Sequence, residues 1–92
     1  MILTFRHKGL EAFATKGDRS KIQQAHVTKI RLILTRLHAA TSPEQMNQPT
    51  YDFHPLKGDL KGFYAVKVSG NWRIIFRFEG ENAKDVDYLD YH

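Results

Sequence analysis

The 92-residue sequence contains no cysteine, which excludes disulfide bonds, thiol catalysis and metal sites built on thiolates. It also lacks any apolar run approaching the roughly 20 residues that a membrane-spanning helix needs. Its N-terminus becomes charged at Arg6, which is too early for a secretory signal peptide. These absences together predict a soluble protein of the cytoplasm.

Acidic residues are missing from the whole stretch between residues 19 and 43, and the charge of the chain is unevenly spread. Residues 1–40 contain eight Lys or Arg and two acidic residues, whereas residues 79–92 contain one lysine and five acidic residues. The formal net charge is +4. A small basic protein with its positive charge concentrated in one half is typical of a polyanion partner. A soluble surface that is merely basic has the same composition, so both interpretations stay open here.

Internal repeats, low-complexity tracts and linkers are absent as well, so we expect one domain over residues 1–92. The hydrophobic fraction of 41% and the charged fraction of 26% are those of an ordinary globular protein. A chain of this length buries enough surface for one core. Disordered and collagen-like classes are therefore excluded.

The first half of the chain has helical periodicity after a short strand at residues 2–5. Leu10, Phe13 and Ala14 have the spacing of a short helix, and Gly17 is a stop signal for it. Residues 20–23 match a capping box at the start of a helix of about five turns.

The apolar positions of this longer helix have amphipathic spacing: Ala25, Val27, Ile30, Ile33, Leu34 and Leu37. Its polar side is basic and carries Lys21, Lys29, Arg31 and Arg36. The helix should end before Pro43, because the proline ring cannot continue it. Ser42 is expected to cap one further helical turn.

The second half alternates with the period of β-strands. Strands are expected at residues 63–69, 72–78 and 86–91, with a short piece at 51–54 and a hairpin turn at Gly70-Asn71. One face of the strand at 72–78 is apolar and forms core: Trp72, Ile74, Phe76 and Phe78. The other face carries Arg73, Ile75 and Arg77. This order of elements predicts an α+β fold, an antiparallel β-sheet with N-terminal helices packed on one face and the other face partly open.

The histidines fall into two groups. Solvent exposure is the expectation for three of them, His7, His26 and His38. His54 begins an HPLKGD segment whose turn holds His54 and Lys57 close together at a strand end. In an extended strand Asp90 and His92 share a face, where the carboxylate would orient the imidazole, whereas strict alternation puts Tyr91 on the opposite face. A terminal histidine is also often frayed and inert.

These residue types are sufficient for cleaving RNA without a metal. Histidine is the natural residue to accept the 2′-OH proton or to protonate the leaving oxygen, which makes His54 and His92 the candidates. Lys57, Arg73 and Arg77 would stabilise phosphate charge, and Tyr91 would position or protonate an oxygen. The same face is equally sufficient for binding RNA without chemistry. The spacing of His and acidic residues does not predict a metal site, and no cofactor motif is present.

Four elements together resemble the HigB toxins of the RelE/ParE toxin superfamily: MILTFRHKGLEAFATKG, HPLKGD, GNWRIIFRF and the final DYLDYH. The likeness covers the chain from end to end. It implies a RelE-like microbial RNase fold and a ribosome-dependent endoribonuclease that cleaves mRNA in the ribosomal A site without a metal. It also implies an antitoxin of HigA type, with a helix-turn-helix domain, as the partner of this toxin.

Carried over by position, the catalytic residues that the resemblance implies are His54, Lys57, Arg73, Asp90, Tyr91 and His92. Some relatives place an arginine in the strand before the hairpin, where Lys67 is the nearest cation here. Lysine is a point charge without the bidentate fork of arginine, so this phosphate contact is expected to be weaker.

The basic helix residues named above, with Lys67 and Arg77, are the candidates for binding the ribosome and RNA. A solvated helix face would have the same residues. The rival functions are a DNA gyrase poison like ParE, which lacks this acid–base set, and a non-catalytic RNA-binding module.

Overall fold

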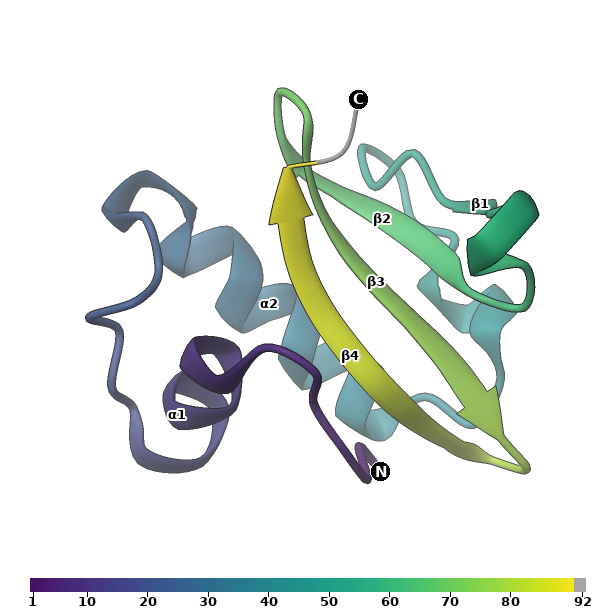
Figure 1. Cartoon of the computed structure of the whole chain (residues 1–92), viewed down its shortest axis with the longest axis horizontal. Coiled ribbons are helices and arrows are strands. Elements are labelled where there is room, and N and C mark those ends of the chain that lie inside the picture. The colour runs from purple at the N-terminus through teal and green to yellow at the C-terminus, as the bar shows by residue number, and fades with distance from the viewer. Residues whose placement is uncertain (91–92) are drawn as a thin grey trace.

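The structure is a computed structural model and describes residues 1–90. Two α-helices and three short 3₁₀ turns precede and interrupt a four-stranded sheet (Figure 1). In chain order the elements are α1 (Lys8–Lys16), η1 (Gln24–His26), α2 (Val27–Ala39), η2 (Pro43–Met46), β1 (His54–Pro55), η3 (Gly58–Leu60), β2 (Tyr64–Ser69), β3 (Trp72–Glu79) and β4 (Asn82–Asp90).

The sheet has the order β1-β2-β3-β4, and every neighbouring pair is antiparallel. The predicted hairpin turn is present at Gly70, which adopts a left-handed backbone with φ 55°. The predicted first strand is reduced to two bridges, in which Ile2 and Phe5 run parallel to β4. The N-terminal segment therefore covers the outer edge of β4 over the first part of that strand.

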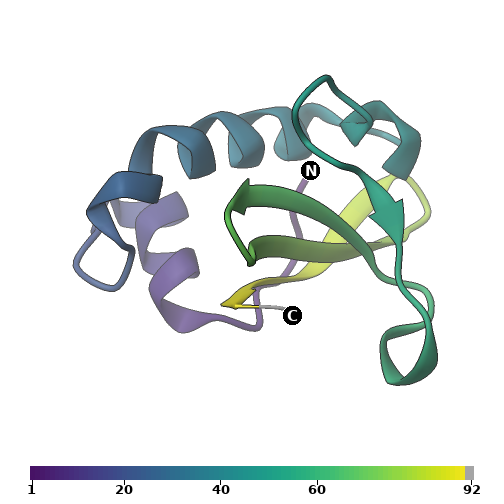
Figure 2. The ribbon, with the colours of Figure 1, turned by 90° about the horizontal axis from the view of Figure 1, so that it is seen from above.

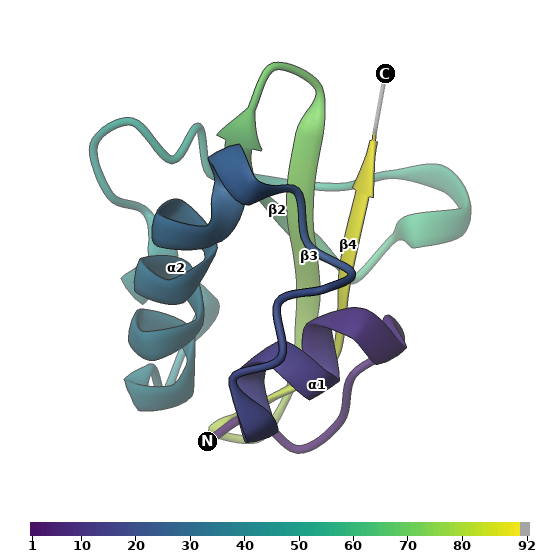
Figure 3. The same ribbon diagram turned by 90° about the vertical axis from the view of Figure 1, so that its left-hand side faces the viewer.

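The main core lies between the helices and one face of the sheet, as the apolar spacing predicts. Figures 2 and 3 show α2 packed across this face and α1 beside the β4 side of it. Its fully buried side chains come from both layers: Leu10, Ile30, Ile33 and Leu37 from the helices, and Ile74, Phe76, Val66 and Val86 from the strands. The α+β fold class with helices on one face is confirmed.

The opposite face of the sheet, which we call the open face, has neither α1 nor α2 packed on it (Figure 2). Part of it is covered by the segment between β1 and β2, which buries a second small apolar cluster. This cluster consists of Leu56, Phe63, Ala65 and Ile75, with Leu60 and Leu89 packed against it. The rest of the open face is lined by charged side chains.

The start of the long helix differs from the capping-box prediction. The α-helix begins at Val27 after the 3₁₀ turn η1, and no side chain caps either element. Ser20 instead donates its backbone N–H to the Asp18 carboxylate at 3.0 Å, which makes a local turn. The Ser42 side chain does not cap η2 either, and the Gln45 N–H donates to the Ser42 backbone carbonyl at 3.3 Å instead. Local hydrogen bonds thus displaced both predicted caps.

Two strand boundaries also differ. β4 begins at Asn82, four residues earlier than predicted, because an irregularity at Asp85 (φ 53°) lets the chain pair with β3 on both sides of it. β1 is only His54–Pro55, and Tyr51 is buried in the main core rather than paired in a strand.

Candidate functional site

The open face carries two cations side by side. Lys67 on β2 and Arg73 on β3 are direct partners in the antiparallel register, and both are half-buried. Like charges directly opposite each other destabilise a sheet, by up to about 1 kcal/mol. The ion pairs formed within residues 1–90 involve other side chains, so neither cation is neutralised by a carboxylate there. Two uncompensated cations at this spacing are suited to hold an anion.

Arg73 is held in place by the hairpin turn that precedes it. Its Nη1 donates to the Gly70 carbonyl at 2.7 Å and to the Trp72 carbonyl at 3.1 Å. Its Nε is buried and has no hydrogen-bond partner among residues 1–90. A guanidinium that the hairpin fixes through Nη1 is a preorganised cation for an oxyanion that binds at its exposed part.

His54 shares the open face, because it is paired with Ala65 in the register of β1 and β2. Its Nδ1 lies 2.8 Å from the carbonyl of Asp52, a residue in a left-handed conformation with φ 49°. A carbonyl can only accept, so this contact requires the proton on Nδ1. In the neutral ring Nε2 then carries a lone pair and is able to accept a proton.

Lys57 is exposed at the start of the segment that covers part of the open face. Both ends of this segment are joined, because Leu56 donates its N–H to the Phe63 carbonyl at 2.9 Å. Two residues separate Lys57 from His54, so their Cα atoms lie within about 11 Å of each other. His54 and Lys57 therefore lie at the same edge of the open face.

A second group of basic side chains, Arg77 and Arg6, lies on the open-face side of the sheet, and only Arg77 of the two was predicted. Arg77 is bound to Asp85 through a 2.7 Å ion pair and lies over the Phe63 ring at 5.6 Å. Arg6 lies over the same ring at 5.5 Å, and its side chain is exposed. Sequence reasoning missed Arg6 because it is distant in the chain from Phe63, and only the path of the N-terminal segment beside β4 brings the two together.

The C-terminal candidates are described only in part. Asp90 is paired with Trp72, which places it at the register position of the helix-side face, whereas Arg73 is paired with Leu89 and occupies the open face. Tyr91 and His92 lie outside the described residues. In the register of β3 and β4, Asp90 and Arg73 thus occupy neighbouring positions at the end of β4 that alternate between the two faces.

The basic residues predicted for the long helix do not form one stripe. Lys21 lies in the segment before η1, and Lys29 is half-buried with its Nζ 5.1 Å from the Tyr51 ring. Arg31 extends over the Phe13 ring of α1 at 5.7 Å, and Arg36 is exposed on α2. All four lie with the helical layer and away from the open face.

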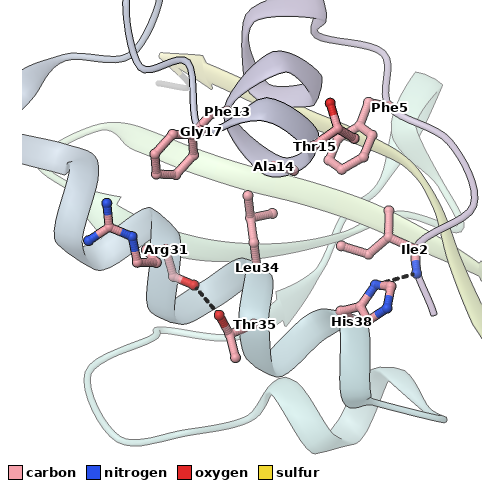
Figure 4. Close-up of a pocket in the computed structure, with 10 residues that line it drawn as sticks. All are labelled: Ile2, Phe5, Phe13, Ala14, Thr15, Gly17, Arg31, Leu34, Thr35 and His38. Atoms are coloured by element: carbon pink, nitrogen blue, oxygen red, sulfur yellow. Dashed lines mark hydrogen bonds between the residues drawn. The ribbon is translucent and has the colours of Figure 1, made fainter.

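A cavity of about 570 Å³ lies between α1, α2 and the N-terminal segment (Figure 4). Apolar side chains including Phe5, Phe13 and Leu34 form its walls, and Arg31 and His38 are its ionisable groups. None of the predicted catalytic residues lines this cavity. The acid–base candidates are on the sheet instead, so the cavity and the candidate site are separate features.

Two kinds of feature are absent from the described residues. No group of three or more His, Asp or Glu within residues 1–90 is arranged to hold a metal ion. Over the same residues, no helix has both the length and the apolar character needed to cross a membrane.

Solved structures share this arrangement of helices and sheet. The YoeB–YefM toxin–antitoxin complex from Staphylococcus aureus matches with a TM-score of 0.63 and 20% identity, covering 100% of this chain and 95% of that one. A mutant of YafQ from E. coli matches with a TM-score of 0.63 and 18% identity, covering 98% of this chain and 91% of that one. The chain therefore has the fold of RelE-like toxins.

Sequence comparison identifies the family within that class. The family described as the RelE-like toxin of type II toxin–antitoxin system HigB matches residues 3–92. The chain is 39% identical to Endoribonuclease HigB of Proteus vulgaris over 92 residues, covering both chains fully. It is 32% identical to Toxin HigB-1 of Vibrio cholerae, covering 100% of this chain and 98% of that one. The chain belongs to the HigB family of toxins, whose partner is an antitoxin.

Proposed function

We propose that residues 1–92 form a single toxin domain that acts as an endoribonuclease, cleaving mRNA in the ribosomal A site and so stopping translation in the cytoplasm. The full-length identity to a relative named an endoribonuclease supports the class of reaction. The observation that carries the site is the Arg73 guanidinium, which the hairpin fixes through Nη1 and which lies opposite Lys67, with no carboxylate paired to either cation within residues 1–90.

The reaction we propose is an internal transfer at phosphorus. A base removes the 2′-OH proton, the 2′-oxygen forms a bond to phosphorus, and the bond to the 5′-oxygen breaks. An acid protonates that leaving oxygen, so the products are a 2′,3′-cyclic phosphate and a 5′-hydroxyl. Negative charge builds on the phosphate oxygens during the transfer, and fixed cations lower the barrier by stabilising it.

The residues of this chain divide these tasks. His54 has a free Nε2 to accept the 2′-OH proton, because its Nδ1 proton is directed to the Asp52 carbonyl. His92, oriented by Asp90, donates the proton to the leaving oxygen. Lys57 and Arg73 stabilise the phosphate, and Tyr91 positions the reacting oxygen.

RNA binding extends beyond the reacting phosphate. Lys67 next to Arg73 and the pair Arg6 and Arg77 beyond Phe63 give two basic groups along the open face, which we propose follow the RNA backbone. The helix-side cations would dock on ribosomal RNA: Lys21, Lys29, Arg31 and Arg36. Replacing Lys29, Arg31 and Arg36 with Gln should then weaken ribosome binding and flatten its salt dependence.

The partner we propose is an antitoxin of HigA type that carries a helix-turn-helix domain. Its family membership makes this chain a toxin with an antitoxin. Co-expression with such an antitoxin should neutralise the toxin and give a complex that co-purifies.

The experiment that tests the function uses ribosomes with a defined mRNA codon in the A site and EDTA in the buffer. Wild-type protein and His92→Gln are compared, and the cut sites are mapped. We expect a cut within that codon by the wild type and none by the variant, with ribosome binding nearly unchanged. A folded, toxic wild type that cuts no RNA would overturn the proposal, and inhibition of supercoiling by it would indicate a gyrase poison instead.

A further inference from the structure

A histidine is buried where the helical layer meets the end of the sheet. His26 has 5% of its surface exposed and is the buried polar residue of the part of the chain that the structure describes. The expectation that it is solvent-exposed is therefore wrong. Its Nδ1 makes a 2.7 Å hydrogen bond with the hydroxyl of Tyr88 on β4, 62 residues away in the chain. Because both His26 and Tyr88 are buried, breaking this hydrogen bond is costly: it would leave a polar atom inside the protein without a partner.

Two further rings enclose the His26–Tyr88 pair. The Trp72 ring lies 4.8 Å from the Tyr88 ring and 5.7 Å from the His26 ring. The His7 ring meets Tyr88 edge-on at 5.4 Å, while its Nδ1 accepts the Leu10 N–H at 2.9 Å and so caps α1. The cluster formed by His7, His26, Trp72 and Tyr88 thus joins the start of α1, the start of α2 and the adjoining ends of β3 and β4.

Tyr88 lies on β4 just beyond the part of the strand that the N-terminal segment contacts. The N-terminal segment bridges β4 at Ala83 and Val86. Beyond Val86, the described part of β4 has β3 as its strand partner, and the last pair in that register is Trp72 with Asp90. Tyr88 is also the last buried side chain of β4, because Leu89 is half-buried and Asp90 is exposed.

Burial raises the pKa of the Tyr88 hydroxyl, and a hydrogen bond to the Gln23 backbone opposes part of that rise. The phenol therefore stays protonated and neutral at physiological pH. Since its charge does not change there, its role in the cluster is that of a hydrogen-bonded anchor.

We propose that His26 and Tyr88 are positioning residues, and that their hydrogen bond fixes the end of β4 from which the chain continues into the C-terminal site residues. This inference rests on the proposed function, because it assigns the C-terminal segment to the reaction. Neither residue is in contact with the RNA in this proposal. They act through the backbone of β4, which they hold against the helical layer.

The test is Tyr88→Phe, which removes one oxygen and keeps the ring. Single-turnover cleavage is measured with protein in excess over the programmed ribosome complex, so that binding and the rate constant are separated. We expect the rate constant to fall by roughly ten- to hundredfold, because even a small misplacement of the reacting groups slows a reaction by about that factor. Binding of the ribosome and the shape of the pH–rate profile should stay as in the wild type, because the acid and the base are unchanged.

Tyr64→Phe is the matched control, because Tyr64 is an aromatic residue of β2 stacked on Phe53 and Phe76, outside this cluster. It should cleave as the wild type does. His26→Leu removes the bond to His26 but leaves the Tyr88 contact with the Gln23 backbone, so its loss should be no larger than that of Tyr88→Phe. The double variant should be no slower than Tyr88→Phe alone, since the phenylalanine already lacks both bonds.

The chain has one tryptophan, and its place in the cluster provides a readout that does not depend on cleavage. Trp72 emission should shift in Tyr88→Phe and in His26→Leu and stay unchanged in Tyr64→Phe. A wild-type rate constant in either cluster variant would overturn the inference, even if the melting temperature fell. Failure of the wild type to cleave would contradict the proposed function instead.

Discussion

Lys67 and Arg73 lie directly opposite each other on neighbouring strands, and within residues 1–90 neither has a carboxylate partner. Such a pair opposes folding slightly, because like charges at adjacent positions of a sheet repel each other. A bound phosphate would remove that repulsion. The arrangement is therefore better suited to holding an anion than to stabilising the free protein.

Lys67→Gln should for this reason separate stability from binding. We expect the free energy of unfolding to rise by up to about 1 kcal/mol, measured by urea denaturation. RNA binding should weaken, and the slope of its dependence on salt should decrease by about one phosphate contact. Arg19→Gln, at an exposed position between α1 and η1, removes the same charge as a control. Weaker folding together with unchanged RNA binding would contradict this role for Lys67.

Arg73→Lys tests whether the shape of the guanidinium matters beyond its charge. Lysine keeps the charge but cannot both bind the Gly70 carbonyl and present a second fixed donor to the phosphate. We expect the single-turnover cleavage rate to fall roughly hundredfold, the cost of losing one preorganised donor. Ribosome binding should change much less than the rate. Equal cleavage by Arg73→Lys and wild type would show that a point charge is enough.

Arg6→Gln tests the basic group that sequence reasoning missed. Arg6 is exposed and lies over Phe63 beside Arg77, whose charge is already offset by Asp85. We expect weaker RNA binding and a smaller salt slope, with the cleavage rate of the bound complex unchanged. Arg19→Gln is again the matched control, and it should bind as the wild type does. If the two variants bind RNA equally well, Arg6 does not contact the RNA.

The strand pattern of the second half was predictable because alternate residues of a strand point to opposite faces of the sheet, one of which is buried in the main core. Ile74 and Phe76 had to enter the main core, so the alternation placed Arg73 and Arg77 on the other side. The position of Gly17 was equally readable, because a left-handed residue at a helix end favours glycine. These features depend on short-range rules that the chain satisfies locally.

What escaped prediction depends on contacts between distant segments. His26 lies next to residues with the period of a surface helix, and only its meeting with Tyr88 buries it. The contact of Arg6 with the Phe63 ring likewise joins segments that are distant in the sequence. The predicted caps at Ser20 and Ser42 failed for a different reason, because both serines make local hydrogen bonds through their backbone. The Ser20 N–H donates to the Asp18 carboxylate, and the Ser42 carbonyl accepts from the Gln45 N–H.

At Gly9, the helix propensity of the residue and its packing against a distant segment have opposite effects on the stability of Gly9→Ala. Alanine in place of glycine inside a helix stabilises it by roughly 0.5–1 kcal/mol, so the sequence alone favours the change. In the structure, however, a Cβ at Gly9 would overlap the Cβ of Lys21 and crowd the His7 ring. Forcing atoms into such a packed position costs about 1–3 kcal/mol. We therefore expect a net loss of stability, seen as a lower urea midpoint with an unchanged m-value.

The double variant Gly9→Ala with Lys21→Gly identifies the cause of that loss. Removing the Lys21 Cβ opens the space that the new methyl group needs, so part of the lost stability should return relative to Lys21→Gly alone. Gly17→Ala is the contrasting case, because nothing lies near its Cβ position and its φ of 73° alone makes alanine unfavourable. Its loss should therefore be the same with Lys21 or Gly at position 21. If Gly9→Ala is as stable as the wild type, the close packing of α1 on the segment at Lys21 is wrong.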